Sequence, residues 1–103
     1  MRYHPHRWLM IRVGDNYKIF GSWNGGYLDS AEWRLNSGVW RVEESGKNFF
    51  VHGFSGSMYL CDKVNYGATT YGQTVLNSIM SDSSTITVLE AKEAFDILRS
   101  FKG

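Results

Sequence analysis

The sequence contains one cysteine, almost no net charge and no long apolar run, and each absence excludes a class of protein. Cys61 alone cannot form an internal disulfide, and no paired cysteines have zinc-site spacing, so we expect a reducing, cytoplasmic setting. Eleven basic and ten acidic side chains give a formal charge of +1, which provides no bulk attraction to nucleic acid or membranes. No run reaches the length of a membrane-spanning helix.

Two sequence signals of targeting and nucleotide binding are also missing. The N-terminal stretch MRYHPHRWLMIRV starts with basic residues, but its apolar part is too short for a signal peptide. Neither GxxxxGK nor GxGxxG occurs, which argues against a P-loop enzyme. The 103 residues, 43% of them hydrophobic, fit a single domain over residues 1–103 whose core needs no metal or disulfide, and we expect no cofactor.

Aromatic rings are abundant instead. Four Trp, six Tyr and six Phe make up 16% of the chain. Each ring buries a large area and tends to dominate either a core or an interface. Because so small a domain has limited interior, some of these rings are expected at the surface, where they can contact another molecule.

The first half of the chain predicts two β-hairpins. Residues 8–13 and 17–23 are rich in β-formers and flank a turn of Gly, Asp and Asn. Residues 33–36 and 39–44 flank Ser-Gly, and a two-residue turn there would place Arg34 opposite Arg41. One side of this second hairpin would then be apolar, with Trp33, Leu35, Trp40 and Val42.

A third hairpin is predicted from residues 49–54 and 57–62, joined by a two-residue Ser-Gly turn. This register gives one aromatic, polar-tipped face, formed by Phe50, His52, Phe54, Tyr59 and Cys61. The reverse face is the expected core side, formed by Phe49, Val51, Met58 and Leu60. Since both faces are apolar, the hairpin is expected at the centre of a sheet.

The last third of the chain predicts two helices. Residues 71–80 have helical apolar spacing, with Thr70 and Gln73 at capping-box positions. A β-branched strand follows at residues 85–89, and an amphipathic helix at residues 90–102. The predicted fold is α+β: a predominantly antiparallel sheet of about six to seven strands, with two helices in the C-terminal third.

Three candidate catalytic or metal motifs are weak. GFSGS fails the GxSxG pattern at its last position and lies in a predicted hairpin rather than a strand-to-helix turn. Cys61 and His52 come within reach in the predicted register but have no third group or oxyanion hole. His4 and His6 have an HxH spacing, but Pro5 lies between them and no carboxylate spacing supports a metal. We therefore expect neither an enzyme nor a metal site.

The preferred hypothesis is a non-enzymatic protein that binds another protein. Tyr27, Tyr66 and Tyr71 lie beside glycines in WNGGY and NYGATTYG, a pattern typical of binding loops, and are candidate aromatic anchors. Arg34 and Arg41 are candidate forks for carboxylate or phosphate groups. Two alternatives stay open: the tyrosines cap the core edge, and Glu32 and Glu43 neutralise the arginines.

Other partners are also compatible with the residue types. The aromatic rings could be covered in a homodimer. A nucleotide or single-stranded nucleic acid could stack on an alternative face formed by Phe50, His52, Phe54 and Tyr59. No membrane partner is expected.

Residues 33–80 contain the stretches WRLNSGVWRVEESG, HGFSGSMYLCDKVNYG and YGQTVLNSIM. In these stretches the chain resembles small uncharacterised accessory proteins of tailed phages. It implies a small protein that binds and blocks a host factor in the host cytoplasm, and it assigns no functional residue.

Overall fold

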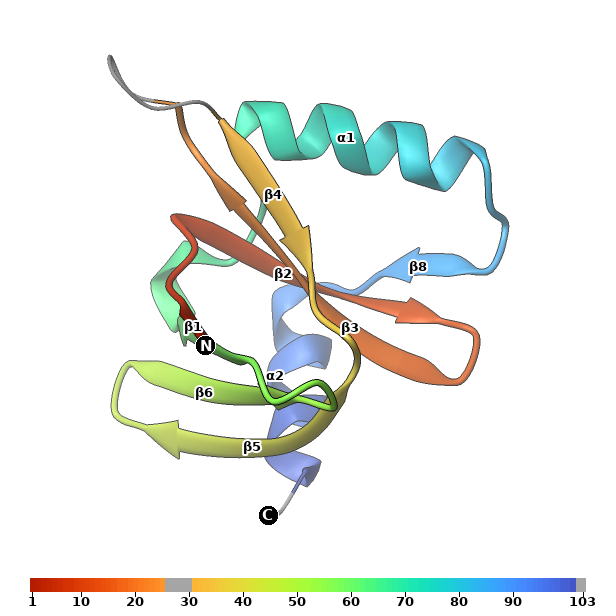
Figure 1. Ribbon diagram of the computed structural model, residues 1–103. Coiled ribbons are helices and arrows are strands. Elements are labelled where there is room, and N and C mark those ends of the chain that lie inside the picture. The colour runs from red at the N-terminus through yellow and green to blue at the C-terminus, as the bar shows by residue number, and fades with distance from the viewer. Residues whose placement is uncertain (26–30, 102–103) are drawn as a thin grey trace.

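The computed structural model describes residues 1–25 and 31–101, which form two four-stranded sheets and two helices (Figure 1). Sheet A has the strand order β1 (Arg2–Tyr3), β7 (Met58–Asp62), β6 (Asn48–Gly53) and β5 (Val39–Ser45). Sheet B has the order β4 (Glu32–Leu35), β3 (Asn16–Trp23), β2 (Arg7–Val13) and β8 (Ile86–Val88). Only the β1–β7 pairing is parallel among these strands. A short 3-10 helix, η1 (Lys63–Asn65), follows β7.

The two helices are α1 (Thr70–Ser81) and α2 (Ala91–Ser100). Both lie in the C-terminal third, so the expected α+β class with mostly antiparallel pairing is confirmed. The strands divide between two sheets, where the sequence suggested one. The amphipathic stripe predicted for the last helix is present, since Ala94 and Leu98 are fully buried.

Sheet B is covered on both faces. One face carries Leu9, Ile11 and Phe20, which pack against Leu76 of α1. Figure 1 shows α1 beyond sheet B, on the side away from β5 and β6. The other face carries Trp8, Met10 and Ile19, which belong to the larger core shared with sheet A and α2.

Sheet A faces this larger core with one side only. Its inner side consists of buried residues that alternate along the strands: Val42, Phe49, Val51, Tyr59 and Cys61. α2 packs on this side and contributes Ala94 and Leu98. Rings from several elements meet here, because Trp8 stacks on Phe95 at 5.9 Å and meets Phe49 edge-on at 6.4 Å.

The predicted second hairpin is wrong. β4 pairs with β3 in sheet B, whereas β5 pairs with β6 in sheet A, so Arg34 does not lie opposite Arg41. Asn36 explains why the chain leaves β4 without turning back: its N–H donates to the Ile19 carbonyl, and its Oδ1 accepts from the Ile19 N–H at 2.9 Å. These bonds continue the β4–β3 pairing, and the chain then crosses to the other sheet.

The third hairpin exists, but its register is shifted by one residue from the prediction. His52 pairs with Met58 and Phe49 with Cys61, so the loop has three residues, 54–56. Gly56 supplies the positive φ of +92° that such a loop needs at its last position. A shift of one residue reverses the faces of one strand, and Tyr59 and Cys61 are therefore buried while Met58 and Leu60 face outward.

α1 begins one residue earlier than predicted, because Thr69 and not Thr70 is its N-cap. The Thr69 hydroxyl accepts a hydrogen bond from the Gly72 N–H at 3.0 Å, and the Thr69 N–H donates to the Ser22 hydroxyl at 3.0 Å. Gly72 allows this close approach, since a Cβ there would lie 2.6 Å from the Cβ of Ser22. The glycine of the second Tyr-Gly pair is therefore required for helix packing on β3.

Candidate functional site

The side of sheet A that points away from the core is the main candidate surface, and we call it the outer face. Strand alternation and register arrange its residues in rows. One row crosses all four strands, and the next crosses three. The first row is Arg41, His52, Met58 and Arg2; the second is Glu43, Phe50 and Leu60.

The centre of the outer face is apolar. Phe50, Met58 and Leu60 belong to neither core cluster and are half-buried by their neighbours in the sheet. Neither helix lies on this side, because α1 contacts β3 and β4 while α2 contacts β5 and β2 from within the core. Within residues 1–25 and 31–101, these apolar side chains therefore have no covering layer.

Charged side chains border this apolar centre. Arg41 Nη2 forms an ion pair with Glu43 Oε1 at 2.8 Å, and His52 Nε2 lies 3.4 Å from the same oxygen. Arg41 Nε and His52 Nε2 are buried and have no hydrogen-bond partner among the described residues. On the opposite side, Arg2 is exposed. The expectation that Glu43 neutralises Arg41 is thus met by geometry, and Arg2 adds a second cation.

A shallow depression of about 290 Å³ lies in the outer face. Its lining combines apolar and charged groups: Arg2, Glu43, Phe50, His52 and Met58. The depression is open to solvent and is lined by all four strands of sheet A. It can receive a group from another molecule whose middle is apolar and whose edge is polar.

Two exposed rings lie at one end of sheet A, and we call them the aromatic corner. Trp40 is 49% exposed and Phe54 is 67% exposed. The Trp40 indole N–H donates to the Gly53 carbonyl at 3.1 Å, and the Phe54 N–H donates to the Gly38 carbonyl at 3.1 Å. A β-bulge between Val39 and Arg41 leaves Trp40 outside the regular pairing. The corner adjoins the outer face, because Trp40 precedes Arg41 and Phe54 follows Gly53.

Tyr66, a predicted binding anchor, is partly buried and packs against both core clusters. Its hydroxyl donates to the Leu89 carbonyl at 2.6 Å and accepts from the Met10 N–H at 3.0 Å. Its ring meets Trp8 edge-on at 4.8 Å. Burial is the main reason that the pKa of Tyr66 rises to about 12. Tyr66 therefore joins β2 to the segment between β8 and α2, as the alternative of a core-edge tyrosine expects.

The other members of the preferred site do not meet in one place. Tyr71 is 42% exposed on the first turn of α1. Arg34 lies over the ring of Tyr3 at 4.6 Å, on the edge strand of sheet B. Arg41 lies on the outer face of sheet A, and Tyr27 falls outside the described residues.

The alternative stacking face is brought together only in part. Phe50 and His52 share the outer face, and Phe54 lies at the aromatic corner. Tyr59 is on the opposite side of the sheet and only 2% exposed, so its predicted place on this face is wrong. Its burial raises the pKa of Tyr59 to about 12.

The structure separates the residues of the weak catalytic and metal motifs. Cys61 is fully buried, which raises the pKa of its thiol well above the ordinary value, and it lies on the inner side while His52 is outside. His4 Nε2 is 2.8 Å from Asp62 Oδ2, whereas His6 Nδ1 accepts from the Asn24 N–H at 2.8 Å. No three metal-ligating side chains gather anywhere in residues 1–25 and 31–101.

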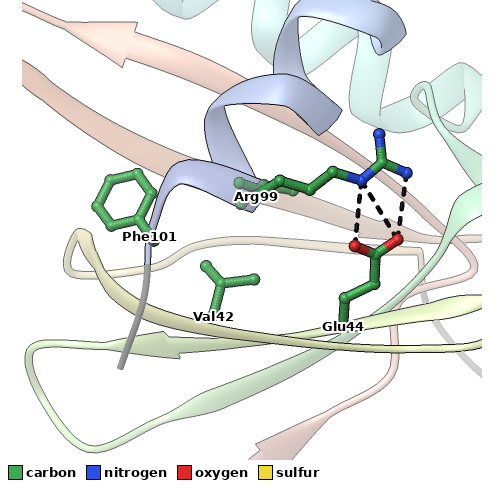
Figure 2. A pocket seen from close by; sticks show the side chains of 5 residues that line it. Val42, Glu44, Arg99 and Phe101 are labelled. Atoms are coloured by element: carbon green, nitrogen blue, oxygen red, sulfur yellow. Dashed lines mark hydrogen bonds and ion pairs between the residues drawn. The ribbon is translucent and has the colours of Figure 1, made fainter.

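A second, smaller cavity of about 150 Å³ lies between α2 and β5 (Figure 2). Its lining includes Val42, Phe101 and an ion pair between Glu44 and Arg99. Arg99 Nε donates to Glu44 Oε1 at 3.1 Å, and Lys63 binds the same carboxylate. The hydrogen bond from Arg99 is the main cause of the low Glu44 pKa of about 2. Since both cations also lie over the ring of Phe49, we assign this cavity to the fold.

Sequence reasoning missed several residues of the outer face. Met58 and Leu60 were expected in the core, and Arg2 lies on a two-residue strand too short to predict. The available signal was the glycine at position 56, which suits the last position of a three-residue loop as well as a two-residue turn. Choosing that loop would have placed both residues outside.

Comparison with known proteins gives no relative: no family model matches the sequence, and no curated protein or solved structure is significantly similar to it. In the part of the chain that the structure describes, neither helix has the length and apolar character needed to cross a membrane.

Proposed function

We propose that this chain is a non-enzymatic binding protein that engages another protein through the outer face of sheet A and the adjoining aromatic corner. The observation that carries the proposal is the apolar centre of Phe50, Met58 and Leu60 with no covering layer in the described chain. Apolar side chains on the open side of a sheet mark a contact site, because water normally faces polar residues there.

The composition of this surface fits a protein partner. Protein interfaces combine an apolar centre, aromatic and Arg anchors and a polar rim. The outer face supplies the centre and the rim, with Arg2 and Arg41 as its arginines. The aromatic corner supplies Trp40 and Phe54 as exposed rings. The resemblance to phage accessory proteins suggests a host protein of the cytoplasm as the partner, and this stays a prediction.

A nucleotide or single-stranded nucleic acid is the second candidate, because Phe50 and His52 share the outer face with two arginines. Rings beside guanidinium groups form stacking platforms for bases. Glu43 weakens this alternative, since its carboxylate borders the same depression and would repel phosphate.

The test is affinity capture from a nuclease-treated host lysate with the wild-type chain and two matched variants. Met58→Glu places a charge in the apolar centre, and Met80→Glu places the same charge on α1, where Met80 is 36% exposed. We expect the captured protein to be lost at least tenfold with Met58→Glu and retained with Met80→Glu. Circular dichroism of both variants checks that they fold.

Two outcomes would contradict the proposed function. Equal capture by both variants would move the contact surface away from sheet A. Capture that is seen only when the nuclease is left out of the lysate, together with binding to single-stranded oligonucleotides that falls steeply with salt, would support the nucleic-acid alternative instead.

A further inference from the structure

We propose that β4, the edge strand of sheet B, pairs with β4 of a second copy of this chain, antiparallel about a two-fold axis. This inference goes beyond the proposed function, because the contact uses sheet B and leaves the outer face of sheet A free. The two B sheets, each of four strands, would join into one continuous sheet. The dimer would then present two outer faces to its partners.

The main chain of β4 is open along one edge. β4 ends sheet B, and its neighbour in that sheet is β3. The Asn36 N–H donates to a β3 carbonyl. Because main-chain groups alternate in direction along a strand, Glu32 and Arg34 also face β3, whereas Trp33 and Leu35 point their N–H and C=O groups away from it. In the part of the chain that the structure describes, no hydrogen bond engages these outward groups.

An edge of this kind accepts another strand, because only an extended chain matches its row of donors and acceptors. The other edge strands suit such pairing less well. β1 has two residues and β8 has three. β5 is longer, but a bulge interrupts it, and its Arg41 already forms an ion pair with Glu43 of the same strand. β4 is regular, and its first three residues are exposed.

The side chains of β4 select a second copy of the same strand. Glu32 and Arg34 carry opposite charges on one side of β4, and neither forms an ion pair with another described residue. When Trp33 lies opposite Trp33 of the second copy, Glu32 of each copy lies opposite Arg34 of the other. The symmetry makes this contact twice. Both charge pairs occupy non-hydrogen-bonded positions, where opposed side chains come closest.

Other registers of the same two strands are less favourable. Sliding the pairing so that Trp33 faces Leu35 would bring the two Arg34 side chains directly opposite each other. Parallel pairing in register would set like charges side by side. Like charges across a strand pair destabilise it, whereas opposite charges stabilise it. The charges therefore specify one antiparallel register, centred on Trp33.

Trp33 supplies the apolar centre of this contact. One face of its ring stacks on Phe20 of β3 at 5.7 Å, which fixes its position, yet the residue is 39% exposed. The proposed register brings the two Trp33 rings together at the two-fold axis. Cross-strand aromatic pairs stabilise strand pairing, and tryptophan is a common anchor of protein interfaces. Dimerisation would thus cover a ring that the single chain leaves partly in water.

Sedimentation velocity of the whole chain over a concentration series measures the dimer. Trp33→Glu would place two carboxylates at the axis and should weaken the dimer at least tenfold. The matched control is Trp40→Glu, which changes the 49% exposed tryptophan of sheet A and should leave the dimer unchanged. Circular dichroism checks that both variants fold. A wild-type chain that stays monomeric throughout the series would overturn the inference.

A mixing experiment tests the register and does not depend on Trp33. Glu32→Arg gives β4 two positive charges, and Arg34→Glu gives it two negative charges, so each variant alone should dimerise at least tenfold more weakly than the wild type. An equimolar mixture should form a heterodimer, because every opposed pair then carries opposite charges. No change within a single chain can produce this recovery. Both residues are exposed, so both variants are expected to fold.

Two results would contradict the β4 contact: a dimer that Trp33→Glu leaves intact, and a mixture of the two charge variants that stays as weakly associated as each variant alone. The proposed function is tested separately. If the chain does not dimerise through β4 while Met58-dependent capture persists, the inference fails and the proposed function stands. If the β4 dimer forms while capture does not depend on Met58, the proposed function fails and the inference stands.

Discussion

The two sheets differ in how they are covered, and that difference separates residues that serve the fold from residues available for contact. Sheet B is closed on both faces, by α1 on one side and by the shared core on the other. Sheet A is closed only on its inner side, where Phe49, Val51, Tyr59 and Cys61 are at most 2% exposed. Apolar side chains on its outer face are only partly buried in the folded chain, so their exposed parts are available to another molecule.

The neighbours Phe49 and Phe50 give the largest expected contrast. Phe49 is fully buried against Trp8 and Phe95, and its truncation to Ala should lower the free energy of unfolding by about 3–5 kcal/mol. Phe50→Ala, on the outer face, should cost about 1 kcal/mol or less because no cavity forms in a core. Urea denaturation of both variants measures the difference. Similar losses would mean that the outer face is covered in the free chain.

The substitution Tyr66→Phe tests a hydrogen bond on the buried side of the same comparison. It leaves the Met10 N–H, which now donates to the tyrosine hydroxyl, without a partner in a buried strand. We expect a loss of about 1–3 kcal/mol in the free energy of unfolding. Tyr71→Phe is the matched control, since Tyr71 is exposed, and should be neutral. A neutral Tyr66→Phe would reopen its role as a binding anchor.

The smallest expected effect concerns the ion pair between Glu44 of β5 and Arg99 of α2. Arg99 and Lys63 hold the pKa of Glu44 at about 2, below its ordinary value of 4.5. A lowered pKa in the folded state contributes stability above the ordinary pKa, and this contribution is lost as pH falls from about 4.5 toward 2.

Glu44→Gln should therefore flatten the acid side of the stability profile, with little further change when Arg99→Gln is added. Thermal unfolding of the wild type and the single and double variants between pH 2 and 6 measures this. Additive effects of the two substitutions would show that the pair does not set the pKa.

Most elements could be predicted from sequence, because their signals are local. The first hairpin, the helical stripe of α1 and the stripe of α2 were all visible in residue spacing, and the structure contains each of them, although the hairpin turn is Gly14-Asp15 rather than the predicted residues 14–16. The pairing of the strands with one another was harder to predict. The Ser37-Gly38 signal is typical of a tight turn, but the hydrogen bonds of Asn36 with Ile19, 17 residues away, keep β4 in sheet B.

The candidate site could be predicted only in outline. The surplus of rings suggested that some reach the surface, and Trp33, Trp40, Phe54 and Tyr71 do so. The residues on the open face of sheet A depended on whether the loop between β6 and β7 has two or three residues. A register shift of one residue exchanges Tyr59 and Met58 between the core and the surface. Arg2 could not be found, because its two-residue strand depends on pairing with β7.

The most direct test of the open outer face uses the four methionine methyl groups as probes in an NMR spectrum. A soluble paramagnetic agent is added to the free chain, and relaxation of each methyl is compared. Met10 is fully buried and should be unaffected, whereas Met58 should relax strongly, as should exposed Met80. Protection of Met58 in the free, monomeric chain, at the level of Met10, would contradict the account.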